Sequence, residues 1–109
     1  ALDTSPFPGV TTSFESISMG VPVLTMKGFN FTSRCGESIN VNLDMKNLIA
    51  QNADEYISKA IYFSENLEEL KKISGLILRE KTFNSALFDN KNFTLNFEEK
   101  LINIHLQSA

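Results

Sequence analysis

The side chains best suited to chemistry lie in one short segment, residues 8–15 (PGVTTSFE), near the start of the chain. A glycine-containing turn leads there into a predicted helix whose first residues, Thr11 and Thr12, carry hydroxyl groups. The start of a helix offers unpaired N–H groups and a partial positive charge, which together favour anions. Because Gly9 lets the backbone approach a ligand closely, the segment predicts a diphosphate seated on Val10, Thr11 and Thr12.

Glu15 stands one turn further along the same predicted helix. Its carboxylate is suited to accept hydrogen bonds from the two vicinal hydroxyls of a ribose, the polar partner that a nucleotide presents beside its phosphates. A second interpretation needs no ligand, because Thr12 and Glu15 also fit the S/T-x-x-E capping box that closes the start of many helices. The residues alone leave both interpretations open.

The elements that must position this segment are predicted to form an α/β unit over residues 1–43. Residues 1–3 would end a strand, and the apolar residues 21–26 fit a parallel strand buried on both faces, with Gly20 ending the helix before it. A second short helix would run from Thr32 or Ser33 to about residue 40. In open α/β sheets ligands bind beyond the carboxyl ends of the strands, where the turn would lie. This predicts a partial Rossmann-like fold.

Residues 44–109 are predicted to be helical. Helices would begin near Asn52, Asn66 and Asp89 or Asn90, and Gly75 would lie inside the second of them. The last helix carries an apolar stripe made of Phe93, Phe97, Leu101 and Ile104. Two strands cannot cover helices this apolar, so we expect the chain to be part of a longer protein, with the rest of a doubly wound sheet missing or supplied by another chain. We expect the separate chain to form homo-oligomers.

The composition and charge of the chain exclude several classes of function. The 109 residues suffice for one modest core, and the net charge of −3, with both signs mixed along the chain, gives no footprint for nucleic acid or an anionic membrane. No apolar run approaches the roughly 18 residues of a membrane span, and the expected location is the cytoplasm. The lone Cys35 and lone His105 supply too few ligands for a structural zinc site, and neither a metal nor a cofactor is expected.

The order of several short segments resembles the O-GlcNAc transferase and SPINDLY-like family of glycosyltransferases. Residues 2–4 (LDT) and 9–26 (GVTTSFESISMGVPVLTM) resemble the donor-binding motif of that family. Later landmarks follow in the same order, namely residues 33–38 (SRCGES), 47–50 (NLIA), 54–56 (DEY) and 85–89 (SALFD). A G-x-T-T turn alone occurs in many glycosyltransferases built from two Rossmann-like domains, the GT-B type. The ordered set is more specific.

The resemblance implies the C-terminal half-domain of a GT-B enzyme, which transfers a sugar from a UDP donor, commonly UDP-N-acetylglucosamine, to Ser or Thr of an acceptor protein. It implies that Thr11 and Thr12 meet the diphosphate and that Glu15 binds the ribose, with Gly9 and Val10 completing the turn. The catalytic His and the phosphate-binding Lys of the family belong to segments upstream of Ala1, so this chain is expected to lack catalytic residues and to be inactive alone.

One departure from the family concerns donor identity. Animal members carry His where this chain has Val10, which offers only its backbone N–H to a ligand. Two alternatives remain: a GT-B enzyme with a glycan or Asn acceptor, and a non-enzymatic module that self-associates. Lys27, at the end of a predicted strand, is interpreted as a solvated side chain rather than a phosphate ligand.

Overall fold

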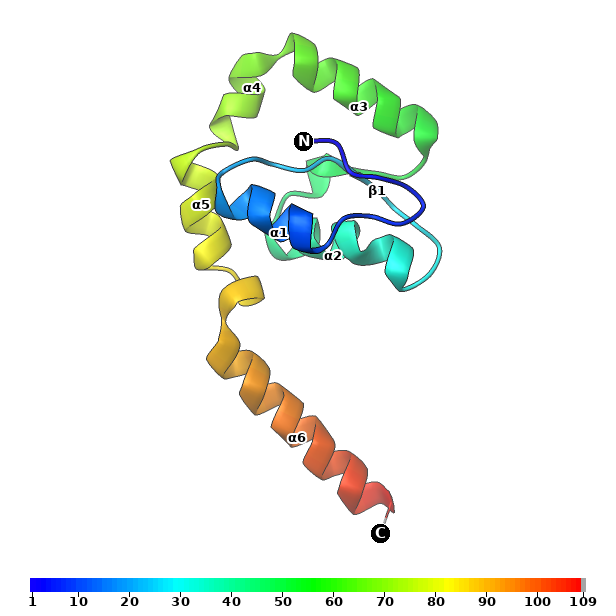
Figure 1. Ribbon diagram of the computed structural model, residues 1–109, viewed down its shortest axis with the longest axis vertical. Coiled ribbons are helices and arrows are strands. Elements are labelled where there is room, and N and C mark those ends of the chain that lie inside the picture. The colour runs from blue at the N-terminus through cyan, green and yellow to red at the C-terminus, as the bar shows by residue number, and fades with distance from the viewer. Residues whose placement is uncertain (109) are drawn as a thin grey trace.

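The computed structural model describes residues 1–108 and is built around a short parallel sheet (Figure 1). Strand β1 (Thr25–Met26) pairs with β2 (Ile49–Ala50), with Thr25 opposite Ile49. On the other side of β1, Leu2 forms a single parallel bridge with Leu24. The backbone N–H of residue 3 donates to the Leu24 carbonyl, and the Leu24 N–H donates to the carbonyl of residue 1, both at 2.9 Å. The first residues therefore do end a parallel strand.

Helices make up most of the rest of the chain. The α-helices are α1 (Thr11–Ser18), α2 (Cys35–Asn42), α3 (Ala53–Glu65), α4 (Leu67–Lys72), α5 (Leu76–Phe83) and α6 (Asn90–Ser108). Within residues 1–108, single-turn 3₁₀ helices lie before α2 (η1, Thr32–Arg34), before β2 (η2, Lys46–Leu48) and between α5 and α6 (η3, Ala86–Phe88). The predicted class, an α/β fragment with few parallel strands followed by a helical region, is confirmed.

Three element predictions differ from the structure. The strand predicted over residues 21–26 is confined to Thr25–Met26, and Val21 is exposed. Strand β2 was missed, because a two-residue strand is too short to show the alternation by which strands are identified. The helix predicted from Asn66 through Gly75 is instead two helices, α4 and α5, and Gly75 stands before α5 with φ of 68°. That φ lies in the left-handed region, which glycine enters readily and which no α-helix interior contains.

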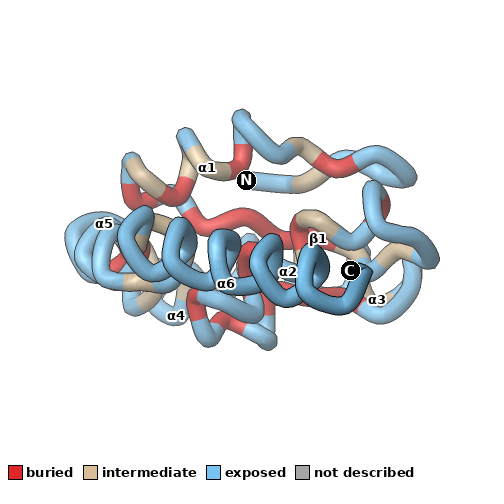
Figure 2. Tube along the Cα trace, turned by 90° about the horizontal axis from the view of Figure 1, so that it is seen from below, coloured by how far each residue is buried: buried red, intermediate tan, exposed pale blue. Residues whose placement is uncertain are grey.

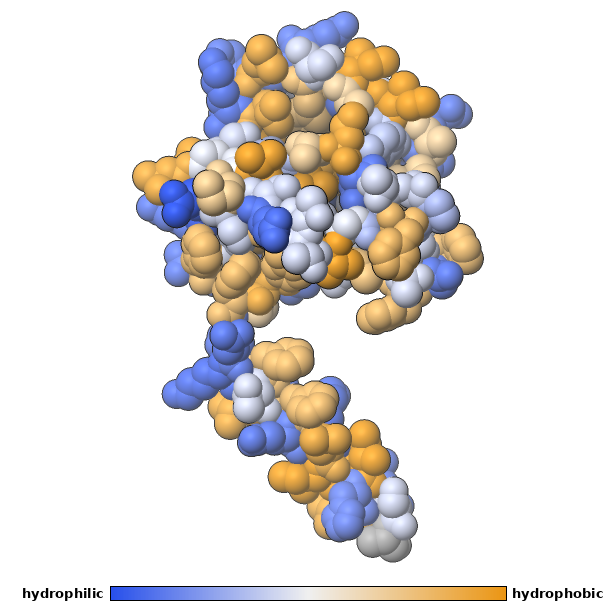
Figure 3. Space-filling view, viewed as in Figure 1, coloured by the Kyte–Doolittle hydropathy of each residue, from blue (hydrophilic) through white to orange (hydrophobic). Residues whose placement is uncertain are grey.

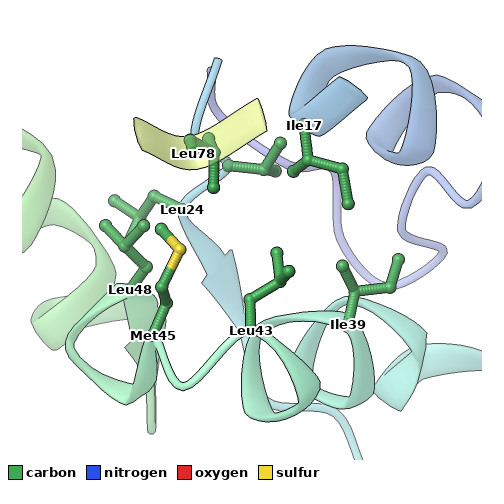
Figure 4. Close-up of a cluster of buried hydrophobic side chains, with 8 residues drawn as sticks. Ile17, Leu24, Ile39, Leu43, Met45, Leu48 and Leu78 are labelled. Carbon is green, nitrogen blue, oxygen red and sulfur yellow. The ribbon is translucent and has the colours of Figure 1, made fainter. Parts of the chain in front are cut away.

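The core lies where α1, α2 and α5 meet the sheet (Figure 4). Its buried apolar side chains are Ile17, Val23, Leu24, Ile39, Leu43, Met45, Leu48 and Leu78. One buried polar side chain joins two parts of this core: the Asn40 amide donates to the carbonyls of Val23, at 2.9 Å, and Leu48, at 3.2 Å. Those bonds satisfy the amide and tie α2 to the segments that enter β1 and β2, because a buried donor without a partner would be costly.

The C-terminal end of α1 is fixed by a backbone contact with the start of α5. Gly20, at φ of 82°, ends the helix as predicted, and the Val21 N–H donates back to the Ser16 carbonyl at 2.9 Å. The Gly20 carbonyl accepts the Gly75 N–H at 2.8 Å. A Cβ on residue 20 would lie 2.5 Å from the Gly75 oxygen, so this approach requires glycine.

Helix α6 extends away from the rest of the molecule, and all of its described residues are exposed (Figures 1 and 2). It begins where predicted, and the Asp89 Oδ1 accepts the Asn92 N–H at 3.1 Å. The predicted stripe is uncovered, with Phe93 68% exposed, and Leu95, Ile102 and Leu106 form a second apolar stripe on nearly the opposite side. Apolar side chains accordingly appear along most of the helix (Figure 3). No described helix is long and apolar enough to span a membrane.

The contact between Gly20 and Gly75 predicts different effects for alanine at the two positions. Alanine at either position must adopt a positive φ, which costs about 1–3 kcal/mol, but only Gly20→Ala also creates a clash with backbone. We expect Gly20→Ala to lower the free energy of unfolding, measured by urea titration, clearly more than Gly75→Ala does. Equal losses in the two variants would show that the close approach is unimportant.

Candidate functional site

Helix α1 starts without a side-chain cap. Its N-cap residue is Val10, and the Val10 carbonyl accepts the Phe14 N–H at 2.9 Å, so the helix begins two residues earlier than a Thr12 cap would require. The capping-box interpretation is therefore wrong: Thr12 is already helical, and Glu15 lies beyond the first turn. A helical residue 12 cannot turn its hydroxyl back to cap the N–H groups that follow it.

The polar groups at this helix start are consequently free. Among the hydrogen bonds within residues 1–108, none uses the backbone N–H of Val10, Thr11, Thr12 or Ser13, and none uses the side chains of Thr11, Thr12 or Glu15. The first turn contains no acidic residue that would neutralise the positive end of the helix. Four unpaired N–H groups and two hydroxyls at such an end form a good environment for an anion.

Three hollows surround the start of α1. Thr11 and Glu15, four residues apart on one helix face, line a hollow of about 560 Å³ that ends against η3. Thr12 and Gly9 line a smaller one, about 170 Å³, on the side of the first strand. Val10 lines a groove of about 770 Å³ between α1 and α2. The five predicted residues therefore share one helix start and face different sides of it.

Gly9 is held by the strand end rather than left free. Its N–H donates to the Asp3 Oδ1 at 2.8 Å, and its carbonyl accepts the Ser13 hydroxyl at 2.9 Å. The Gly9 amide is therefore unavailable to a ligand, and the free N–H groups begin at Val10. What Gly9 contributes to the site is the position of the residues that follow it.

Asp3 lies in the segment 2–4 that resembles the donor-binding motif, but its role in holding the turn was not predicted. Besides the Gly9 N–H, its carboxylate accepts the Thr4 N–H at 3.0 Å and, through Oδ2, the hydroxyl of the buried Thr25 at 2.8 Å. A Cβ on Gly36 of α2 would lie 2.6 Å from the same Oδ2. The sequence did contain a signal for this role, because Asp3 directly follows a strand and precedes a Pro- and Gly-rich loop. Asp commonly accepts hydrogen bonds from the backbone of such turns.

Tyr56 of α3 supports the same strand end from the other side. Its hydroxyl donates to the Asp3 backbone carbonyl at 2.8 Å. Burial, reinforced by the negative charge of Asp3, raises the pKa of Tyr56 above its ordinary value. The hydroxyl therefore keeps its proton, and its donated bond, throughout the neutral range.

The remaining chemically capable side chains lie apart from α1 or are occupied. Lys27 is exposed, and His105 lies on α6. Arg34 pairs with Glu37 at 2.8 Å on one wall of the groove between α1 and α2, and the Cys35 sulfur lies 3.6 Å from the Phe31 carbonyl. Within the described part of the chain, no three His, Cys, Asp or Glu side chains are grouped as metal ligands would be.

Comparisons with known proteins give consistent results over nearly the whole chain. The sequence model of glycosyl transferase family 41 matches residues 1–97. The chain is 39% identical over 98 residues to a protein of Solanum lycopersicum called probable UDP-N-acetylglucosamine–peptide N-acetylglucosaminyltransferase SPINDLY. That match covers 90% of the chain and 10% of the tomato protein.

Two further similarities agree with it. A UDP-N-acetylglucosamine–peptide N-acetylglucosaminyltransferase of Caenorhabditis elegans is 29% identical over 100 residues, which are 92% of this chain and 9% of that protein. The solved structure of a mutant O-GlcNAc transferase from Thermobaculum terrenum superposes with a TM-score of 0.83 at 32% identity, covering 93% of this chain and 19% of that one. The chain thus spans about a tenth of the length of the curated relatives it matches.

The Tyr56 bond predicts a pH-dependent stability. Because the folded-state pKa of Tyr56 is raised, the bond stabilises the fold fully below the unfolded tyrosine pKa of about 10 and is lost as the pH rises through the folded value. Tyr56→Phe should cost about 0.5–1.5 kcal/mol at pH 8 and less at pH 11, measured by urea unfolding. Tyr62→Phe is the control, because the Tyr62 hydroxyl makes no bond within the described residues. A Tyr56→Phe cost that stays constant with pH would contradict the assignment.

Proposed function

Because the chain belongs to glycosyl transferase family 41, we propose that residues 9–15 are part of the donor site of a protein O-glycosyltransferase, and that the donor is a UDP-sugar, UDP-N-acetylglucosamine in the first instance. One observation carries the proposal: the start of α1 combines four unpaired N–H groups, two free hydroxyls and, one turn on, a free carboxylate. The activity of the whole protein is part of the same proposal.

Each predicted residue has a defined role in this site. The diphosphate lies on the N–H groups of Val10, Thr11 and Thr12, with the two Thr hydroxyls as additional donors. The Glu15 carboxylate accepts hydrogen bonds from the ribose hydroxyls, across the hollow that it shares with Thr11. Gly9, whose amide is used internally, fixes where these groups begin.

The helix start would also assist the chemical step. When the bond between the sugar C1 and the diphosphate oxygen breaks, negative charge accumulates on the departing UDP. The positive end of α1 and the fixed donors around it stabilise that charge more than they stabilise the intact donor, which is how such groups accelerate a reaction. The acceptor hydroxyl and the groups that activate it are assigned to other parts of the protein, and the isolated chain is proposed to be inactive.

Val10 gives the donor a backbone N–H and an apolar side chain, so the turn recognises phosphate and ribose but no base. An enzyme of the same type with a glycan or Asn acceptor is the nearest alternative. The cytoplasm is the proposed location.

A titration of the chain with UDP tests the site. Backbone amide shifts should be concentrated at residues 9–15, and the double variant Thr11→Ala, Glu15→Gln should raise the Kd at least tenfold, because a bond to a charged group contributes about 1.5–3 kcal/mol and about 1.4 kcal/mol corresponds to a factor of ten. Thr94→Ala with Glu98→Gln is a matched control, since it makes the same changes at the same spacing on α6.

Three results would count against the site: no shifts at millimolar UDP, shifts scattered over the chain, or an unchanged Kd in the Thr11, Glu15 variant. An increase of the Kd in the α6 control as well would point to a general effect of the substitutions.

The exposed face of α6 favours a second property, self-association of the separate chain. Sedimentation should show oligomers whose proportion rises with concentration, because the two apolar stripes gain contacts only between molecules. Phe97→Glu with Leu101→Lys should shift the distribution to monomer, whereas Asn96→Glu with Asn103→Lys, on the polar side, should not. A wild-type chain that remains monomeric at high concentration would refute this property.

A further inference from the structure

We infer that Asp3 is the positioning residue of the proposed donor site: its carboxylate sets where the free amides of α1 point, although it touches no ligand itself. The inference rests on the proposed function for its consequence, the effect on donor affinity. Its structural part, control of the turn by Asp3, stands on the geometry of the ligand-free chain.

The carboxylate joins three elements that meet at the turn. Oδ1 holds the Gly9 N–H at 2.8 Å and the Thr4 N–H at 3.0 Å, which fixes both ends of the loop 4–9 against the strand end. Oδ2 holds the hydroxyl of Thr25, a residue of β1 that is 1% exposed. The loop is thereby tied to the central strand through one side chain.

Gly9 passes this constraint to the helix. It directly precedes Val10, whose carbonyl begins the hydrogen-bond ladder of α1, and the Gly9 carbonyl accepts the Ser13 hydroxyl within the first turn. Among the described residues, the bond to Asp3 is the only one that the Gly9 N–H makes. If it is lost, the chain before Val10 can rotate and the free N–H groups lose their common direction.

The surroundings of Asp3 leave little freedom for the carboxylate. Gly36 of α2 packs so closely that a Cβ there would lie 2.6 Å from Oδ2 and 2.2 Å from the Thr25 hydroxyl. Tyr56 holds the Asp3 backbone at 2.8 Å. No Lys, Arg or His forms an ion pair with Asp3 among residues 1–108, so hydrogen bonds alone satisfy the carboxylate. Position rather than charge is therefore the property of Asp3 that the turn uses.

This distinction makes asparagine an informative replacement. Asp3→Asn keeps an oxygen at Oδ1 for the Gly9 and Thr4 N–H groups, and its amide can donate to Thr25, whose hydroxyl also accepts. It also removes a negative charge from the vicinity of a diphosphate. Asp3→Ala removes all three side-chain bonds.

The experiment compares Asp3→Ala, Asp3→Asn and Thr25→Val in the full chain. We measure the Gly9 amide proton shift without ligand, the thermal midpoint and the Kd for UDP. Asp3→Ala should move the Gly9 amide proton upfield and raise the Kd about tenfold, because misdirected N–H groups would lose about one bond to the charged diphosphate. Asp3→Asn should keep the Gly9 shift and bind UDP at least as tightly as the wild type.

Thr25→Val separates positioning from general stability. It removes a bond to the same carboxylate and should lower the thermal midpoint, but it leaves the Gly9 bond in place and should not change the Kd. If Asp3→Ala does not fold, Asp3→Ser gives the same comparison, because its short side chain cannot reach both Gly9 and Thr25.

Two outcomes overturn the inference: an Asp3→Ala chain with an unchanged Gly9 shift and Kd, or a Thr25→Val chain whose Kd rises as much as that of Asp3→Ala. A wild-type chain that binds no UDP would refute the proposed function instead. In that case the inference as stated also fails for the donor site, while the Gly9 shift still shows whether Asp3 controls the turn.

Discussion

This structure depends on one constraint: the start of α1 lies beside the ends of three parallel strand segments, which are residues 1–3, β1 and β2. The first N–H groups of any α-helix have no partner within the helix, and in α1 the neighbouring side chains supply none either. Parallel pairing through Leu24 and β1 brings the strand ends to one edge of the sheet, and the loop before Val10 delivers α1 to that edge. An unpaired helix start at such an edge is a place for an anion.

Much of this arrangement follows from sequence pattern. The α/β order, the end of α1 at Gly20 and the uncovered stripe of α6 were all predictable, because each rests on local chemistry or on helical periodicity. Strand β2 could not be predicted because two residues show no period. Gly75 was compatible with a helix interior, at a modest cost, and also with the left-handed conformation that it adopts. Which of these two conformations a glycine adopts depends on contacts with residues distant in the sequence.

The predicted site residues do meet at the start of α1, but the sequence could not assign their bonds. Thr12 and Glu15 fit the capping-box pattern. The structure shows that the N-cap is Val10, so the helix begins before Thr12 and the pattern does not form a cap. For Asp3, the sequence provided no assignment of its bonds. Its carboxylate bonds Gly9, six residues along the chain, and Thr25, on another strand, and these residues become neighbours only in the folded chain. Physical chemistry alone supports binding of an anion beside a polar ligand at these free groups. The family match adds that the chain belongs to a family of glycosyltransferases.

The backbone contact between Gly20 and Gly75 has a consequence for how the chain folds. It closes a long loop, residues 21–74, which contains the sheet pairing, α2 and α3. Closing such a loop costs chain entropy before its contacts form, and contacts between distant residues slow folding. The end of α1 has local bonds of its own, but its bond to Gly75 forms only when this loop closes, so we expect that bond to form late in folding. Helix α6, built from local contacts, lies outside that cooperative unit.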